Sequence, residues 1–179
     1  QGAPYDVFLS ADADHPHGLL TVGRAIAVRP YAIGRLVLVG PPDMPDQWGA
    51  ALARAASGPL AIANPKLAPY GAAARAALDA AGLTPAQVIT GDSVGQVAAF
   101  VASGNVGFGL LALAQVLDGL NDTTRFAFVE APDTGVSLTQ SAALIADTPA
   151  ARAFFEWITG PEAAPKIAAA GYHLPKPAP

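Results

Sequence analysis

Residues 60–74 read LAIANPKLAPYGAAA, and this stretch predicts a strand, a tight turn and a helix in direct succession. Leu60 and Ile62 are typical of a short buried strand, and Asn64-Pro65 must end it because proline cannot continue a central strand. Pro69 favours a first helical turn, since its fixed φ already has the helical value, and alanines continue the helix. The stretch therefore favours an α/β protein.

The start of this predicted helix offers backbone N–H groups to a ligand. The first N–H groups of a helix have no partner within it, and the aligned peptide dipoles add partial positive charge there. We expect the N–H groups of Tyr70, Gly71 and Ala72 to point outward and to suit an oxyanion. Ordinary strand-to-helix turns have the same geometry, so this feature alone does not establish a ligand.

A second strand-to-helix turn follows along the chain. The strand expected at 88–90 is followed by Ser93, a good N-cap for a helix that continues to Ala102. Helices that follow neighbouring strands begin at the same edge of a sheet, where open α/β sheets bind ligands. The predicted ligand-binding residues are Tyr70, Gly71, Ser93 and Val94.

Strands and helices are expected to alternate along the whole chain, which favours α/β architecture with mostly parallel sheets. Two long β-rich stretches, 31–39 and 136–146, bracket the middle of the chain and predict two hinge strands. We expect an inserted lobe at 37–139 and a second lobe made of 1–36 and 140–179. Further strands are expected at 7–10, 106–113 and 126–129, and further helices at 45–56, from Thr148-Pro149 onward and at 162–170.

The composition excludes several classes of protein. The chain has 179 residues, 52% hydrophobic and 13% charged, with a net charge of −4 and no cysteine. It has no basic cluster for nucleic acid, and much of its apolar content is alanine rather than a run of about 18 strongly apolar residues. Without cysteine there is no disulfide and no thiol catalysis. We therefore predict no nucleic acid partner and no membrane span.

The sequence gives little support for an enzyme. His15 and His17 flank a proline and lack the helical i, i+4 spacing of a zinc pair, and His173 lies far from both in the sequence. The carboxylates are scattered through predicted loops and caps, and no serine lies in a GxSxG motif. The glycine pair Gly107 and Gly109 has no phosphate-binding motif around it and indicates close packing instead. No catalytic residue, metal site or cofactor is predicted.

Several segments resemble, in order, the periplasmic molybdate-binding proteins of ABC transporters. The resemblance covers nearly the whole chain, and LAIANPKLAPYG is its most specific part. The segments are GAPYDVFLSAD (2–12), YAIGRLVLVGP (31–41), LAIANPKLAPYGAAA (60–74), ASGNVGFGLLALAQV (102–116) and TPAARAFFEWITGPEAAPKIAAAGY (148–172).

The resemblance implies a type II periplasmic binding protein fold whose two lobes close over molybdate or tungstate. It implies that the anion is transported, bound by N–H and hydroxyl donors without metal-ligating side chains, and passed to an ABC transporter permease. Tyr70 and Val94 match family positions whose backbone N–H groups bind the anion. Ala112 stands where some members carry a tyrosine, and in that branch Tyr70 lines the pocket.

The chain departs from the family at its front, where the N-terminal βαβ segment and half of the expected anion donors have no counterpart. Two interpretations follow: a piece of a longer protein, or a naturally shortened homologue with a complete inserted C-terminal lobe and an incomplete N-terminal lobe. The alternative function is a non-transporting interaction module that forms a homodimer or pairs with another chain through an exposed sheet edge. The family location is the periplasm, although QGAPYDVFLSADAD (1–14) is not a signal peptide.

Overall fold

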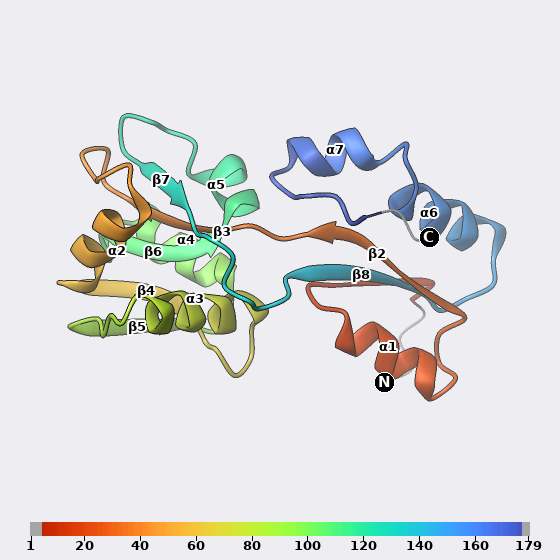
Figure 1. The fold of residues 1–179 in the computed structure, drawn as a ribbon. Coiled ribbons are helices and arrows are strands. Elements are labelled where there is room, and N and C mark those ends of the chain that lie inside the picture. Colours follow the sequence, from red (N-terminus) through yellow and green to blue (C-terminus); the bar gives the residue numbers. More distant parts are fainter. Residues whose placement is uncertain (1–4, 177–179) are drawn as a thin grey trace. The chain divides into compact units, whose positions relative to one another are not determined.

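A computed structural model describes residues 5–176, and its contacts divide the chain into two compact units (Figure 1). Unit 1 comprises Gln1–Gly34 and Leu138–Pro179, and unit 2 comprises Arg35–Ser137. The predicted residues 1–4 and 177–179 of the outer lobe lie outside the described residues. Whether the two units act as the two lobes of a binding protein that closes over its ligand stays a prediction.

Strands and helices alternate as expected for an α/β protein. Unit 1 contains β1 (Val7–Ser10), α1 (Asp14–Thr21), β2 (Ala27–Ile33), β8 (Thr139–Leu144), α6 (Pro149–Thr159) and α7 (Ala164–Ala169). Unit 2 contains β3 (Leu36–Gly40), α2 (Trp48–Ala56), β4 (Pro59–Ala63), α3 (Pro69–Ala80), β5 (Gln87–Gly91), α4 (Val94–Ala102), β6 (Phe108–Ala112), α5 (Leu113–Gly119) and β7 (Ala127–Glu130). No helix in 5–176 is both long and apolar enough to span a bilayer.

Unit 2 is built on a five-stranded sheet in the order β5-β4-β6-β3-β7. The strands β5, β4 and β6 run parallel, whereas β3 runs antiparallel to both of its neighbours, β6 and β7. The chain leaves β4 through α3 to reach β5 on one side, and leaves β5 through α4 to reach β6 on the other side. Since such crossovers are right-handed, α3 and α4 cover opposite faces of the sheet.

Alternate residues of the central strands fill the two cores of unit 2. On one face, α4 and α5 pack on a fully buried cluster that includes Val37, Val39, Ala61 and Leu111. The intervening strand residues are also buried and face the side where α2 and α3 contact β3 and β4: Leu36, Leu38, Leu60, Ile62 and Leu110. Burial of both faces explains why these strands are continuous apolar runs rather than alternating ones.

Unit 1 has a three-stranded sheet in the order β1-β8-β2, in which both outer strands run antiparallel to β8. The strands β1 and β2 therefore run parallel to each other, joined by α1, with the late strand β8 between them. Phe155 of α6 is 1% exposed and packs with Ala142 and Leu144 on one face of this sheet. Ile167 of α7 packs with Ala32 in a smaller cluster.

Three sequence predictions about the strands were wrong. The sheets are not mostly parallel, because the direction of a strand is set by its partners and not by its apolar pattern. The stretch 31–39 is not one strand: β2 ends at Ile33, which lies opposite Thr139 of β8, and β3 begins at Leu36, which lies opposite Ala112 of β6, so the chain changes strand partners in between. The stretch 136–146 contains only the strand Thr139–Leu144. Among the helices, α1 and α5 were not expected.

Candidate anion-binding site

The ends of β4 and β5 bring two helix N-termini to the same edge of the sheet in unit 2. The strands are parallel, with Ala63 opposite Gly91, and the N–H of Asn64 donates to Gly91 O at 2.7 Å. The helices α3 and α4 start after these two strand ends. This arrangement is the one predicted from the sequence, and it lies entirely within one unit.

The turn between β4 and α3 is held by Asn64. Its side-chain Oδ1 accepts the N–H of Lys66 at 3.0 Å, and its backbone oxygen accepts the N–H groups of Leu67 and Ala68. These bonds end the strand and direct the chain into Pro69, the first residue of α3. The turn is therefore fixed by local bonds, which gives the start of α3 a defined position.

Gly71 packs against the end of β4 more closely than any other residue type could. A Cβ built at Gly71 would lie 2.4 Å from Ala63 O and 2.7 Å from the carbonyl carbon of Asn64, both of which are backbone atoms. Tyr70 is also buried, with 4% of its surface exposed. The glycine thus lets the first turn of α3 approach the strand end directly.

One part of the donor prediction for α3 was wrong. The N–H groups of Gly71 and Ala72 both donate to Ala68 O, at 2.9 and 3.2 Å, so they are used inside the helix. Pro69 has no N–H, and the N–H of Tyr70 stays a prediction. Gly71 therefore positions the first turn of α3 through its packing, and its amide is not an outward-pointing donor.

The start of α4 is more open. Ser93 is exposed and caps the helix as predicted: its Oγ accepts the N–H of Gln96 at 3.3 Å, while Gln96 Oε1 accepts the N–H of Asp92 at 2.7 Å. In the part of the chain that the structure describes, the N–H groups of Val94 and Gly95 have no internal acceptor. The Ser93 hydroxyl can still donate its own hydrogen, because its bond to Gln96 uses the oxygen as acceptor.

The N–H of Gly95 was not among the donors predicted from the sequence. Its signal is the N-cap itself, since a capped helix leaves its first two amides for solvent or a ligand. Gly95 is exposed, and the nearest neighbour that a Cβ would meet is Ser93 Oγ at 3.7 Å. Three donors from consecutive residues, Ser93, Val94 and Gly95, therefore lie at the start of α4.

The strand β6 fixes the position of α4. A Cβ on Gly109 would lie 2.7 Å from Val101 Cγ2 and 3.2 Å from Val97 Cγ1, so the helix packs directly on the strand backbone. The predicted close packing is confirmed for Gly109 and is wrong for Gly107, around which a Cβ would meet nothing within 4 Å.

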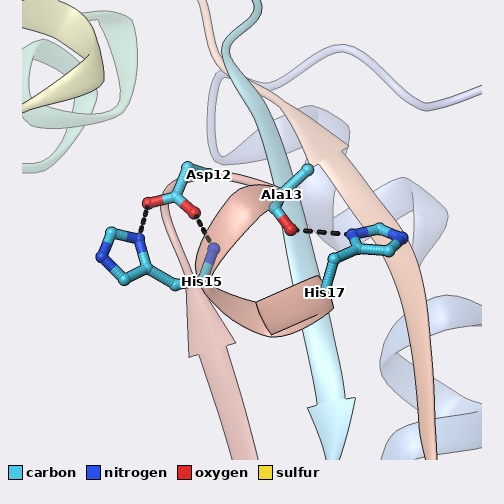
Figure 2. A network of polar contacts seen from close by, with 4 residues as sticks. All are labelled: Asp12, Ala13, His15 and His17. Atoms are coloured by element: carbon cyan, nitrogen blue, oxygen red, sulfur yellow. Dashed lines mark hydrogen bonds and ion pairs between the residues drawn. The ribbon is translucent and has the colours of Figure 1, made fainter. Parts of the chain in front are cut away.

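The two histidines of α1 point to separate partners (Figure 2). Asp12 accepts the N–H of His15 at 2.9 Å and lies 2.7 Å from its Nδ1, whereas His17 Nδ1 lies 2.8 Å from Ala13 O. Partial burial raises the pKa of Asp12, but the hydrogen bonds from His15 outweigh it and hold that pKa below its usual value. Within the described residues, no group of three or more His, Asp or Glu side chains could hold a metal ion.

The family model for bacterial extracellular solute-binding proteins matches residues 1–173. The chain belongs to this family. It is 40% identical to the molybdate-binding protein ModA of Azotobacter vinelandii over 182 residues, which cover 97% of this chain and 72% of that protein. It is 36% identical to ModA of Rhodobacter capsulatus, over 96% of this chain and 70% of the relative.

A solved structure agrees with these relatives. The periplasmic molybdate-binding protein of Azotobacter vinelandii matches with a TM-score of 0.84 and 35% identity, over 98% of this chain and 80% of that structure. The predicted periplasmic binding protein fold and the predicted resemblance are confirmed.

Proposed function

We propose that this protein binds a tetrahedral oxyanion, molybdate or tungstate, as the solute-binding component of an ABC uptake system in the periplasm. The observation that carries the proposal is 40% identity to a molybdate-binding protein over 97% of the chain. Two helix N-termini at adjoining strand ends support it, since backbone amides hold anions well. In this role the protein is a binder without a catalytic step, a cofactor or a resident metal, and it delivers the anion to a permease.

The proposed donors are the N–H groups of Val94 and Gly95, the hydroxyl of Ser93 and the N–H of Tyr70. Neutral donors suit an anion that must be released again, because they select its shape without a fixed opposite charge. Gly71 contributes by holding the turn of Tyr70 against β4. With a net charge of −4, the chain must attract the anion through such local dipoles.

Calorimetry with molybdate, tungstate and sulfate tests the proposal. We expect saturable binding of molybdate and tungstate and a rise in Tm with each. If none of the three anions gives heat or raises Tm, the binding proposal is refuted, while membership of the family stands.

A proline at position 94 tests the Val94 amide specifically. Val94 is the first residue of α4, where proline is tolerated, and Ser93 before it is extended at φ −148° and ψ 165°, as a residue preceding proline should be. Val94→Pro should keep the helix but lose one charge-assisted hydrogen bond, which weakens molybdate binding by about 1.5–3 kcal/mol. Val94→Ala also removes the valine side chain but keeps the N–H, so it should bind molybdate nearly as well as the wild type. Equal affinities of the proline and alanine variants would exclude the Val94 N–H as a donor.

A second function, self-association through unit 1, is favoured by one observation. Within the described residues β1 pairs with β8 alone, Leu9 of β1 is 42% exposed, and Tyr5, which precedes the strand, is 71% exposed. Unpaired strand edges with apolar side chains bind further strands. Light scattering at micromolar concentration should then show a homodimer that Leu9→Lys disrupts; a monomeric wild type removes this function.

A further inference from the structure

A cavity of about 390 Å³ lies within unit 1, remote in sequence from the proposed anion donors. Its walls come from β2, from the end of α6, from α7 and from the segment after His173, which pairs with Ile33 of β2. The volume falls in the range of small-molecule sites. Its position in one unit means that the geometry of unit 1 alone defines it.

The walls are mainly apolar. Ile158, Ala164, Ile167 and Leu174 supply aliphatic surface, and Tyr31 supplies an aromatic ring. Leu174 is 44% exposed, so its side chain offers apolar surface whose burial would be stabilising. An occupant with an apolar body would remove this surface from water.

The neutral polar groups of the walls already have internal partners. The Tyr31 hydroxyl donates to Gln140 Oε1 at 2.9 Å, and Thr159 Oγ1 donates to Phe155 O at 2.8 Å. Burial, followed by the proximity of Tyr172, raises the pKa of Tyr31 to about 12, so its hydroxyl stays a neutral donor. The groups left to recognise a polar end of a ligand are the two cations that line the cavity, Arg29 and Lys176.

Both cations can accept an anionic partner. Arg29 Nη1 donates to Glu156 Oε2 at 2.7 Å, but these side chains are 50% and 62% exposed, and the guanidinium has further N–H donors. No carboxylate among the described residues forms an ion pair with Lys176. Exposed pairs such as Arg29–Glu156 are weak, so a ligand carboxylate can share the arginine.

An adjoining hollow fixes the polarity of the site. It is about 270 Å³, shares Gly160 and Pro161 with the cavity, and is lined by Glu156 and Glu162. A carboxylate is repelled from Glu162, whereas Glu156 already compensates part of the charge of Arg29, so the uncompensated attraction comes from Lys176. The cavity therefore offers an apolar floor with positive charge and an acidic neighbour.

From this juxtaposition we propose that unit 1 carries a second site, which binds a medium-chain carboxylate: the apolar chain lies on Ile158, Ile167 and Leu174, and the carboxylate contacts Arg29 and Lys176. This site is independent of oxyanion binding, so its test neither supports nor weakens the proposed function.

The probe is decanoate, titrated into the whole chain by calorimetry and followed by NMR of isoleucine methyl groups. Decanoate should bind with one-to-one stoichiometry and shift the methyl signals of Ile158 and Ile167, while Ile62 and Ile89 of unit 2 keep theirs. Neutral decanol should bind at least fivefold more weakly, because it cannot use the two cations.

Matched variants separate the cavity from its surroundings. Ala164→Phe fills the cavity and should weaken decanoate binding tenfold or more, whereas Ala153→Phe places the same ring in the acidic hollow and should leave it unchanged. Lys176→Glu should weaken binding on the order of fivefold, and Lys166→Glu, on an exposed part of α7, should not. The proposal is overturned if decanoate causes no heat and no methyl shift at millimolar concentration, if decanol binds equally well, or if Ala164→Phe and Lys176→Glu bind as wild type.

Discussion

Replacing Gly71 with alanine tests whether the close approach of α3 to β4 holds the proposed site together. The added Cβ would lie 2.4 Å from Ala63 O and 2.7 Å from Asn64 C, which are backbone atoms that cannot rotate away. Such overpacking costs about 1–3 kcal/mol. Alanine also gains up to about 1 kcal/mol over glycine from helix propensity. Because both clashing atoms are backbone, we expect the upper part of that cost, about 2–3 kcal/mol, and a net loss of about 1–2 kcal/mol in the free energy of unfolding.

Gly49→Ala is the matched control, because Gly49 lies in the first turn of α2 in the same unit and a Cβ there would meet nothing within 4 Å. Both substitutions are made in a Trp157→Phe background, so that fluorescence reports Trp48 of unit 2 during urea unfolding. Gly49→Ala should be neutral or more stable, whereas Gly71→Ala should unfold at lower urea and bind molybdate more weakly, because the Tyr70 turn moves. If the two variants unfold at the same urea concentration, the proposed close contact does not govern the stability of unit 2.

Two further predictions concern packing and pH. Gly109→Ala should cost about 1–3 kcal/mol of unfolding free energy, because its Cβ would meet Val101 Cγ2 at 2.7 Å. Val101→Ala itself costs stability, since Val101 is buried, but Gly109→Ala should cost much less in that background than in the wild type. Urea unfolding of the single and double variants measures this coupling, and additive losses would contradict the contact. Asp12→Ala should cost about 1 kcal/mol at pH 7, since Asp12 caps the first turn of α1 through the N–H of His15. Because the folded-state pKa of Asp12 is lowered, its contribution to stability is present above the unfolded pKa and is lost as the pH falls through the folded pKa. The difference in stability between wild type and Asp12→Ala should therefore shrink in acid. A difference that grows below about pH 4 would contradict this sign.

Local signals made the helix starts predictable from sequence. Ser93 and Thr148 both cap their helices as expected, and Thr148 Oγ1 accepts the N–H of Ala151 at 3.2 Å. Pro69 marks the first residue of α3. These features depend on a few neighbouring residues, so a short stretch of sequence contains all the information they need.

Features that depend on distant partners were not predictable. The antiparallel directions of β3 and β8 follow from strands that are far apart in the sequence, and an apolar run does not encode them. The sequence also did not show that the N–H of Gly71 donates to Ala68 O within the first turn of α3 and so does not point outward. The helix α1 was not expected, and its Pro16 lies in the first turn, where proline is tolerated because its missing N–H would have had no partner.

The central place of β8 in unit 1 has a consequence for how the protein is made. As a nascent chain leaves the ribosome, β1 and β2 emerge early, but each of them pairs with β8, which begins at Thr139. At about 5–20 residues per second, roughly 5–20 s pass between synthesis of Ile33 and of Thr139. The strands of unit 2, which ends at Ser137, are all synthesised within that interval, so its sheet can begin to form while β1 and β2 still lack their partner. Translation thus orders the start of assembly: the sheet of unit 2 can begin to form before the sheet of unit 1 can close around β8.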